Sequence, residues 1–332
     1  MAARPQAVAR VLEAVTQTVR SHEMFVPGDV VMVAVSGGPD SMCLLNSLYL
    51  LRRLLKVHLE VFHFDHRLRA GSGDDALYVK RTAAKLKLPF HLEVATSAPE
   101  KGGSVEDWAH RARTQTLARV LRETGATKAA IAHTRDDQAE TVLLAVIRGG
   151  GLDSATGIRP CQGPYVRPLI DSTRKEVEAF CRALHLRPRI DPSNENTNLL
   201  RNAVRHKVLP QLERAVDREV KATLARTADN LRFDADLLQQ LALRPFDDLY
   251  EEEPEGFSFP AAALVSLPQA LGTRVVRTAL YKAGLAPPSS EHIDAVLDIA
   301  SGRPGRRRDL PGGLLATRDR EYVRVSRTRS GG

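Results

Sequence analysis

An apolar run that leads directly into a glycine turn constrains the fold of this chain more than any other stretch. Residues 30–35 are continuously apolar, the turn Ser36-Gly37-Gly38-Pro39-Asp40-Ser41 follows, and apolar residues at helical spacing begin at Met42. A strand buried on both faces shows such a run, and a helix that opens behind a glycine turn presents free backbone N–H groups to an anion. The stretch therefore predicts a strand, a phosphate-binding turn and a helix.

The residue types of this turn indicate what it would bind. Gly37 and Gly38 can adopt backbone angles closed to other residues, and the hydroxyls of Ser36 and Ser41 supply hydrogen-bond donors. Asp40 replaces the lysine of a Walker loop, and because a carboxylate repels bare phosphate it predicts a magnesium ion or a substrate ammonium group beside it. The alternative is an ordinary loop in which Asp40 or Ser41 only caps the helix.

Strand and helix patterns alternate behind this turn. Short apolar runs predict strands, and apolar residues at helical spacing predict helices. Strands are expected at 30–35, 57–64, 90–94 and 128–132, and helices at 42–55, 73–87, 104–123, 136–148 and 176–186. This order indicates an α/β fold with a doubly wound parallel sheet, whose ligand crevice lies at the carboxyl ends of the strands.

We expect three segments along the chain. Residues 1–215 form the α/β domain and begin with a packed amphipathic helix over 4–20. Residues 216–255 form a helical connection that ends in an acidic linker at 247–255, and residues 256–332 form a small basic α+β domain. Within the last segment the patterns predict helices at 267–283 and 291–301 and a hairpin over 314–325.

Charge and cysteine content limit the functions open to the chain. The net charge is +8, and residues 301–332 alone carry nine arginines against three acidic residues. This excess predicts a polyanionic partner, with Arg306, Arg307 and Arg308 as the densest cationic run, and the alternative is a solvated face. The three cysteines form no C-x-x-C pair, which favours a reducing cytoplasm, and no apolar run is long enough to cross a membrane.

Acidic residues crowd the predicted start of the 136–148 helix. Helical spacing places Glu140 beside Asp136 and Asp137, and His133 ends the preceding strand. Acids in a first turn favour the helix dipole, which is one interpretation. Three acids and a histidine exceed what capping needs, so we expect a metal or cation site here.

Two other strand and helix segments carry polar side chains toward the same crevice. His63 and His66 follow the second strand, and without thiolates beside them we expect polar contacts to a ligand and no zinc. Arg113 lies off the apolar line of its helix, so it is either a solvated charge or an arginine aimed at developing phosphate charge.

A basic cluster between residues 182 and 207 points to the substrate class. Six Arg and Lys residues face two acids there, and Arg201 and Arg205 can cluster on one helix. Asn202 can hydrogen-bond a base edge or a nucleic-acid backbone. We therefore expect Arg201, Asn202 and Arg205 to bind RNA.

Taken together, these segments resemble the tRNA(Ile)-lysidine synthetase family of the PP-loop ATP pyrophosphatases. The resemblance covers about residues 30–212 and is weaker in the tail, at 309–313. The matching segments, in the family's order, are the 36–41 loop, His63–Arg69, the helix over Glu106–Arg113, His133–Thr141, Arg148–Gly151, Arg167–Leu169, Asp191–Asn194 and Arg201–Arg205.

The resemblance implies a two-step reaction that uses ATP and Mg²⁺. ATP adenylates O2 of the wobble cytidine in the CAU anticodon of tRNA(Ile), and the ε-amine of free lysine then attacks C2 and expels AMP. The residues are consistent with this: the 36–41 loop would bind ATP, and Asp40, Asp136, Asp137 and Glu140 would share the lysine and the metal, with Mg²⁺ at Asp40 and Asp137. Arg113 and His133 would stabilise charge.

Three alternatives remain open from the residues. A sulfur-transferring enzyme of the same loop family is expected to carry paired cysteines, which this chain does not have. A synthetase for a small metabolite would give the basic segments no function. A non-catalytic module that senses ATP or binds RNA would give the carboxylates none. The sequence leaves the oligomeric state open, a homodimer included.

Overall fold

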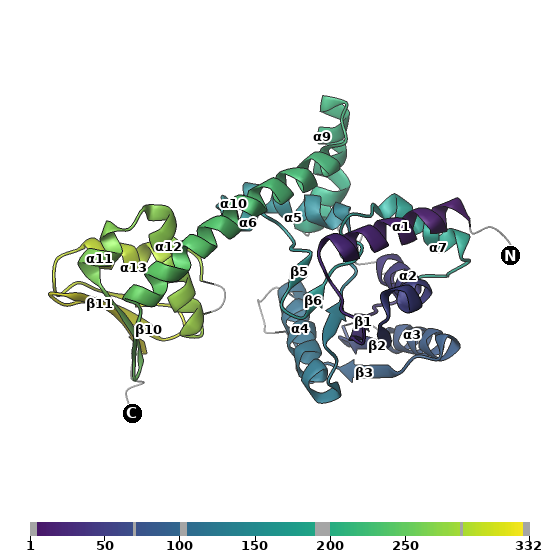
Figure 1. Ribbon diagram of the computed structural model, residues 1–332, viewed down its shortest axis with the longest axis horizontal. Coiled ribbons are helices and arrows are strands. Elements are labelled where there is room, and N and C mark those ends of the chain that lie inside the picture. The colour runs from purple at the N-terminus through teal and green to yellow at the C-terminus, as the bar shows by residue number, and fades with distance from the viewer. Residues whose placement is uncertain (1–4, 69–70, 100–104, 190–199, 286–287, 328–332) are drawn as a thin grey trace. The chain divides into compact units, whose positions relative to one another are not determined.

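The computed structural model describes residues 5–68, 71–99, 105–189, 200–285 and 288–327. It divides into two compact units, and the division falls between Asp229 and Asn230, inside the helix α10 (Val220–Leu249) (Figure 1). The predicted boundaries at 215 and 255 therefore differ from the observed one, because a single long helix contributes to both units.

The first unit is built on a six-stranded sheet. Its order is β3-β2-β1-β4-β6-β5, and every neighbouring pair is parallel except β5 with β6. The strands are β1 (Val30–Ala34), β2 (His58–Asp65), β3 (Phe90–Val94), β4 (Lys128–Ala130), β5 (Cys161–Gln162) and β6 (Tyr165–Val166). The predicted doubly wound parallel sheet is confirmed, with an antiparallel edge that the patterns missed.

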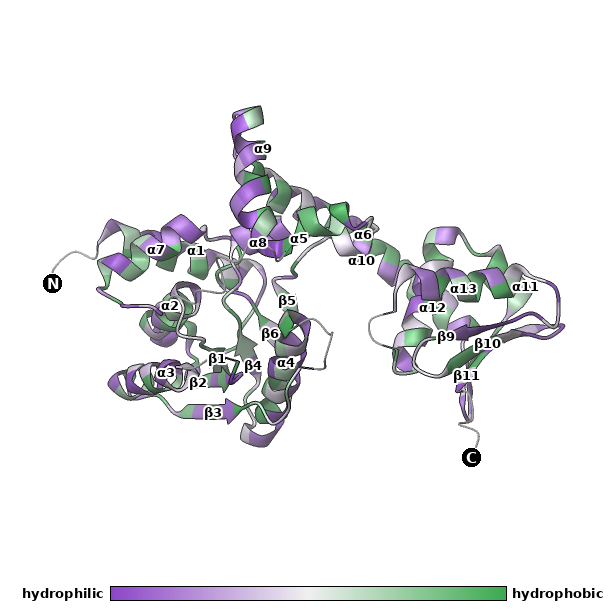
Figure 2. Ribbon diagram, turned by 180° about the vertical axis from the view of Figure 1, so that it is seen from behind, coloured by the Kyte–Doolittle hydropathy of each residue, from purple (hydrophilic) through white to green (hydrophobic). Residues whose placement is uncertain are grey.

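Helices cover this sheet and follow the predicted order. They are α1 (Gln6–Ser21), α2 (Pro39–Leu55), α3 (Ser72–Leu86), α4 (Val105–Thr124), α5 (Arg135–Ile147), α6 (Leu152–Ala155) and α7 (Arg174–Ala183). The packed first helix is confirmed, because the apolar stripe of α1 from Val8 to Val19 is buried in the main core. In Figure 2, α7 mixes hydrophilic and hydrophobic residues around its turns, as a helix with one buried face does.

The strand order creates a switch point beside β1. From β1 the chain passes through α2 to β2, which pairs with one side of β1. From β3 it returns through α4 to β4, which pairs with the other side of β1. Connections that leave neighbouring parallel strands in opposite directions open a crevice at their carboxyl ends. The loops after Ala34 and after Ala130 meet at this crevice.

Between α7 and β7 (Glu251–Glu253), the described residues form four helical segments. They are α8 (Leu200–Ala203), a π-helical turn (Val204–Val208), α9 (Leu209–Val216) and α10. The polar stretch over 211–242 is helical on both sides of Asp217, which has a positive φ of 48° and separates α9 from α10. None of the helices in the described ranges is long and apolar enough to cross a membrane.

The second unit packs helices against a five-stranded antiparallel sheet of order β7-β8-β11-β10-β9. Its elements are β7 (Glu251–Glu253), β8 (Gly256–Pro260), α11 (Ala261–Ser266), α12 (Gln269–Lys282), α13 (Ser290–Ser301), β9 (Arg307–Leu310), β10 (Leu314–Arg318) and β11 (Tyr322–Arg327). The predicted hairpin is confirmed in β10 and β11, and Phe257 and Phe259 of β8 fill the core.

The acidic segment 247–255 is not a linker. It contains the end of α10 and the edge strand β7, which pairs antiparallel with β8. Glu252 lies 3.0 Å from Lys282 Nζ, and Glu253 pairs with Arg324. The charge run is therefore a sheet edge whose acids neutralise cations of the same unit, and an edge strand tolerates such charges because one side of it meets solvent.

Candidate active site

The loop after β1 holds its shape through Ser41. The Ser41 hydroxyl accepts hydrogen bonds from the backbone N–H groups of Ser36 and Gly37, both at 3.2 Å, and donates to the carbonyl of Gly38 at 3.0 Å. Gly37 has φ +92°, which L side chains rarely adopt. Pro39 occupies the first helical position of α2, where its missing N–H costs nothing. The N–H groups of Ser36 and Gly37, expected to face an anion, are thus engaged within the loop.

Asp40 lies in the first turn of α2 and is largely buried. One oxygen, Oδ2, lies 3.4 Å from an Nη2 atom of Arg174. The other, Oδ1, is buried and has no hydrogen-bond partner among the described residues. Burial disfavours the charged form and raises the pKa of Asp40 to about 6, although the Arg174 guanidinium opposes the shift.

Asp137 caps α5 and also faces the crevice. Its Oδ2 accepts hydrogen bonds from the N–H and the hydroxyl of Thr134, both at 2.8 Å, in a capping box. Its Oδ1 accepts one from Arg205 at 3.0 Å. Burial alone raises the pKa of Asp137, yet the Thr134 N–H and the nearby arginines hold it below the usual range. The capping interpretation is therefore correct for one carboxylate oxygen.

Asp136 ties three helices together. Its Oδ2 accepts from the backbone N–H of Arg174 at the start of α7, and its Oδ1 accepts from Lys221 Nζ near the start of α10, both at 2.8 Å. Burial opposes ionisation, but these two donors outweigh it and lower the pKa of Asp136. Both oxygens of Asp136 are thus engaged with groups of the same chain.

Glu140 is the most buried carboxylate of the group, with 1% of its surface exposed. Arg205 donates two hydrogen bonds to it, from Nε to Oε1 at 2.6 Å and from Nη2 to Oε2 at 2.8 Å. Arg201 Nε donates a third to Oε2 at 3.2 Å. A planar guanidinium suits such a two-point contact. Arg201 and Arg205, expected to bind RNA, therefore lie against the carboxylates, and Asn202 between them is buried.

His133 is held in the neutral form. Arg167 Nε donates to His133 Nδ1 at 3.2 Å, so Nδ1 acts as an acceptor. Burial, together with the charges of Arg167 and Arg113, lowers the pKa of His133 to about 3. A neutral imidazole that accepts at Nδ1 carries its proton on Nε2, and His133 can therefore donate a hydrogen bond to an anion.

Arg113 is half-buried on α4. It makes no hydrogen bond or ion pair with any residue in the described part of the chain, and burial lowers its pKa. Its charge lowers the pKa of His66, His110 and His133. The partial burial of Arg113 and its effect on three histidines argue against a fully solvated charge.

The two histidines after β2 have different surroundings. His63 is buried, and its Nδ1 donates to the carbonyl of Val35 at 2.7 Å, which fastens β2 to the start of the Ser36–Ser41 loop. The ring of His66 lies 4.7 Å from Phe64 and 6.2 Å from Trp108, and burial lowers its pKa to about 4. His63 thus holds the start of the Ser36–Ser41 loop against β2.

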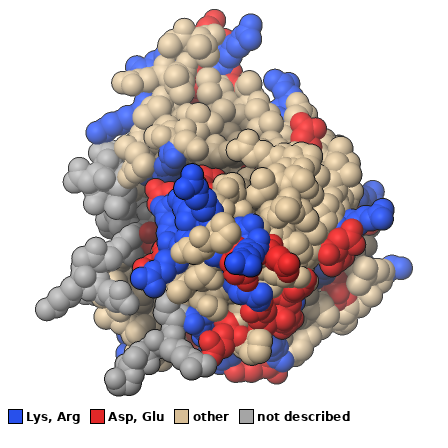
Figure 3. Space-filling view, turned by 90° about the vertical axis from the view of Figure 1, so that its left-hand side faces the viewer, with Lys and Arg blue, Asp and Glu red and all other residues tan. Residues whose placement is uncertain are grey.

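The arginines predicted to bind RNA at 306–308 belong to the second unit. Arg306 lies 2.9 Å from Asp298, whereas Arg307 and Arg308 are exposed on the edge strand β9. Figure 3 shows that Lys and Arg side chains gather beside acidic ones on the face that it draws. The positive charge of the unit is therefore partly balanced by its own acids, whereas Arg307 and Arg308 of β9 lie exposed to solvent.

No group of three or more His, Cys, Asp and Glu side chains could hold a metal ion within the described residues. Magnesium prefers few protein oxygens and keeps several waters, so a smaller set suffices. Asp40 fits it, because Oδ1 is a buried anionic oxygen without a donor. Asp137 fits only if the metal replaces Arg205 at Oδ1.

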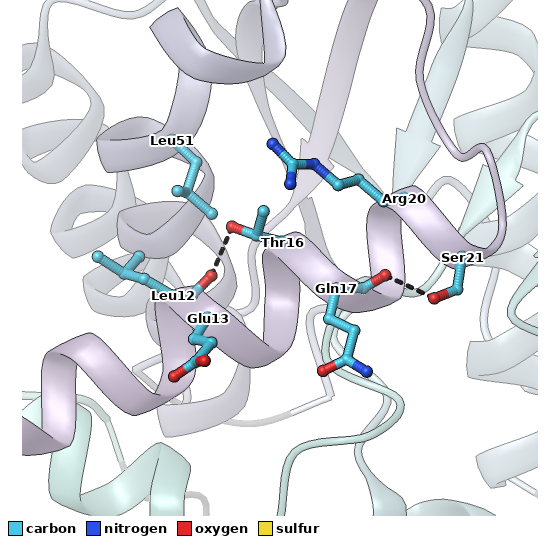
Figure 4. A pocket seen from close by; sticks show the side chains of 7 residues that line it. All are labelled: Leu12, Glu13, Thr16, Gln17, Arg20, Ser21 and Leu51. Carbon is cyan, nitrogen blue, oxygen red and sulfur yellow. Dashed lines mark hydrogen bonds between the residues drawn. The ribbon is translucent and has the colours of Figure 1, made fainter.

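A groove elsewhere on the first unit has no such chemistry. It has a volume of about 410 Å³ and is lined by residues of α1 and by Leu51 (Figure 4). Its Thr16 and Ser21 hydroxyls donate to carbonyls of their own helix. Leu51 lies near the opposite end of α2 from Asp40, so this groove is separate from the crevice.

Three cations of the site were not among the predicted site residues. Arg167, Arg174 and Lys221 contact His133, Asp40 and Asp136 respectively. A local signal existed for Arg174, because the Thr-x-x-Glu spacing of Thr173 and Glu176 is that of a capping box, which the two residues form at the start of α7. Arg167 lies in one of the segments that resemble the family, whereas nothing local marked Lys221, because its partner Asp136 lies 85 positions away.

The two units match different family models. Residues 7–212 match a model described as a PP-loop domain, and residues 259–329 match one described as a TilS substrate binding domain. A solved U34-tRNA thiolase from Methanococcus maripaludis shares the fold, with a TM-score of 0.59 and 17% identity over 68% of this chain and 79% of that one.

Three curated proteins that are similar to this chain are all named tRNA(Ile)-lysidine synthase. Proteins named tRNA(Ile)-lysidine synthase from Gloeobacter violaceus and Geobacter sulfurreducens are each 38% identical, over 86% and 95% of this chain and 86% and 70% of their own lengths. One from Symbiobacterium thermophilum is 37% identical over 91% of this chain, which spans about two thirds (66%) of that relative's length. By its two domain matches and these identities, the chain belongs to the tRNA(Ile)-lysidine synthase family of PP-loop enzymes.

Proposed function

We propose that this chain forms lysidine at the wobble cytidine of tRNA(Ile) with the CAU anticodon. In the first step, O2 of the cytidine attacks the α-phosphorus of ATP and pyrophosphate leaves. In the second, the ε-amine of free lysine attacks C2, and the C2–O2 bond breaks as AMP leaves. One observation carries the proposal: the Ser36–Ser41 loop and the Asp137–Glu140 helix entrance lie at the carboxyl ends of the neighbouring strands β1 and β4.

The site supplies groups suited to each charge that the reaction develops. Asp137 and Glu140 provide buried negative charge for the lysine ammonium, and Arg201 and Arg205 beside them provide positive charge for its α-carboxylate. Arg113 and the Nε2–H of neutral His133 are suited to the negative oxygens of the adenylate.

ATP would bind at residues 36–41, with its phosphates toward the start of α2. A magnesium ion would be held by Asp40 and by Asp137, and when bound it would neutralise charge on the phosphates. The buried, unpartnered Oδ1 of Asp40 supports this assignment. Ser36, Gly37 and Ser41 then act as the framework that fixes where Asp40 lies.

The tRNA would be recognised by both units. The anticodon triplet is shared with methionine tRNA, so discrimination requires contacts outside it. Arg306, Arg307 and Arg308 in the second unit are the proposed RNA-binding residues. The first unit would contact the wobble cytidine at the crevice, where Arg201 and Arg205 are paired with Glu140 and Asn202 is buried. A cytoplasmic location belongs to this proposal, since ATP, lysine and tRNA meet there. Homodimer formation stays a prediction.

The test is a reconstituted reaction with the full chain, ATP, Mg²⁺, labelled lysine and an unmodified tRNA(Ile) transcript. We expect mass spectrometry of the digested tRNA to show cytidine converted to lysidine, with one AMP formed for each lysine incorporated. The methionine tRNA transcript with the same anticodon serves as the control and should remain unmodified. Release of inorganic phosphate without lysine incorporation would overturn the proposal.

The buried thiols weigh against the sulfur-transfer alternative. Burial raises the pKa of Cys181 to about 12 and that of Cys43 still further, which keeps both protonated. Thiol chemistry and cluster ligation both need thiolates. Iron or persulfide sulfur in the purified protein would restore that alternative.

A further inference from the structure

Arg174 is the one cation that contacts the carboxylates on both sides of the crevice within the described residues. Its Nη2 atom lies 3.4 Å from Asp40 Oδ2 and 3.8 Å from Asp137 Oδ1. Asp40 belongs to the helix after β1 and Asp137 to the helix after β4. Arg174 therefore bridges the two loops between which the nucleotide would lie.

Hydrogen bonds at the start of α7 hold the backbone of Arg174 in place. Its N–H donates to Asp136 Oδ2 at 2.8 Å. The preceding residue, Thr173, caps α7 in a reciprocal box with Glu176, whose Oε2 accepts from the Thr173 N–H and hydroxyl, both at 2.9 Å. The guanidinium thus extends from a rigid helix start, which is how a binding group is preorganised.

Two buried atoms of opposite character remain without partners at this place. Arg174 Nε is a donor and Asp40 Oδ1 is an acceptor, and neither forms a hydrogen bond with any described residue. Buried polar atoms in native proteins are nearly always hydrogen-bonded, and the exceptions call for a ligand or a water. An anion alone would accept a hydrogen bond from Arg174 Nε but be repelled by Asp40. A cation alone would bind Asp40 Oδ1 but be repelled by the Arg174 guanidinium.

We propose that Arg174 is a ligand-binding residue that recognises a metal-bound polyphosphate. In this arrangement Nε donates to an oxygen of the β- or γ-phosphate of ATP, Nη2 keeps Asp40 Oδ2 in place, and Oδ1 is left for the divalent cation that the phosphates bring. The ligand class is a magnesium-bound triphosphate or pyrophosphate, in contrast to a nucleoside monophosphate. This inference rests on the proposed function, because it assigns ATP to the same crevice.

The full chain offers a matched pair of variants for the test. Arg174→Gln and Lys175→Gln each remove one positive charge from adjacent residues at the start of α7, but Lys175 is exposed and forms no contact with the carboxylates. Binding is measured by calorimetry with three probes: AMPCPP with Mg²⁺, which cannot be cleaved between the α- and β-phosphates, pyrophosphate with Mg²⁺, and AMP.

We expect Arg174→Gln to weaken Mg·AMPCPP and Mg·pyrophosphate binding about tenfold or more while leaving AMP binding within about twofold, because one charge-assisted hydrogen bond is lost. Lys175→Gln should bind all three probes like the parent. A purely structural role would weaken AMP equally and lower the melting temperature. Parent-like binding of Mg·AMPCPP by Arg174→Gln, or an equal loss for AMP, would overturn the inference.

Failure of the proposed function would look different. If the parent binds Mg·AMPCPP but transfers no lysine to tRNA(Ile), the lysidine proposal fails while the role of Arg174 is still supported by the variant pair. If the parent transfers lysine and Arg174→Gln keeps parent affinity for Mg·AMPCPP, only the inference about Arg174 fails.

Discussion

Replacing Glu140 by glutamine would test whether the buried ion pairs hold the site together. The change keeps the shape of the side chain but removes its charge, so Arg205 and Arg201 lose the carboxylate that receives three of their hydrogen bonds. Breaking a buried ion pair costs about 3–5 kcal/mol, since the remaining charge is left uncompensated. We expect the lower end, about 3 kcal/mol, because Arg205 keeps Asp137 and the glutamine oxygen still accepts one bond.

The magnitude can be read as a melting temperature. The first unit ends at Asp229, and for a unit of that size each 1 kcal/mol corresponds to about 2–4 °C. Differential scanning calorimetry of the full chain should therefore show its first-unit transition lowered by roughly 6–12 °C, with the second-unit transition unmoved. Glu178→Gln is the matched control: Glu178 faces Arg182 at 3.8 Å on the exposed side of α7 and should change stability by about 0.5 kcal/mol or less.

A double-mutant cycle would show where the energy lies. Arg205→Gln combined with Glu140→Gln should cost less than the sum of the single changes by about 1.5 kcal/mol or more, because the two side chains interact directly. If Glu140→Gln melts like Glu178→Gln, or if the two changes add, the ion pairs contribute nothing to the fold of the site and the reasoning is refuted.

Three further predictions follow from the same side chains. Asp40→Asn should stabilise the chain, measured in the presence of a chelator, by up to about 3 kcal/mol above pH 6 and by almost nothing below pH 4. The reason is that the folded parent has an Asp40 pKa raised from 3.8 to about 6, so the parent loses stability as the pH rises from 4 to 6. Equal dependence of the unfolding free energy on pH for parent and variant, measured by urea unfolding, would contradict this prediction. Asp137→Asn should abolish lysidine formation with tRNA affinity nearly unchanged in a filter-binding assay, and loss of both would place Asp137 in RNA binding. Arg306, Arg307 and Arg308 changed together to alanine should weaken tRNA binding and lower its salt slope by roughly 2–3, whereas a parent-like slope would make β9 a solvated edge.

Much of the first unit could be predicted from local pattern. The strand over 90–94 matches the structure to the residue, because its alternation of apolar and polar residues is a local signal even at the half-buried edge of the sheet. The capping box of Thr173 and Glu176 likewise needs only four neighbouring residues. The order of strands and helices also determined the class of the sheet, since alternating elements can bury their apolar faces only by parallel crossover connections.

Four strands at or next to a sheet edge carry no such local signal: β5, β6, β7 and β9. β7 and β9 consist largely of acids and arginines, and β5 and β6 have two residues each. An edge strand meets solvent along one side and so needs no apolar run. The same residues were therefore read as a linker and a basic tail, and only pairing with β8 and β10 makes them strands.

The candidate site divides in the same way between sequence and tertiary structure. Short motifs identified Asp40, Asp137 and Glu140, because a phosphate loop and a helix entrance are local features. The cations beside this group of carboxylates come from distant positions: Arg205 lies 65 positions from Glu140, Lys221 85 positions from Asp136 and Arg174 134 positions from Asp40. The tertiary fold alone decides those pairings, since Coulomb attraction acts between atoms brought close in space regardless of their separation along the chain.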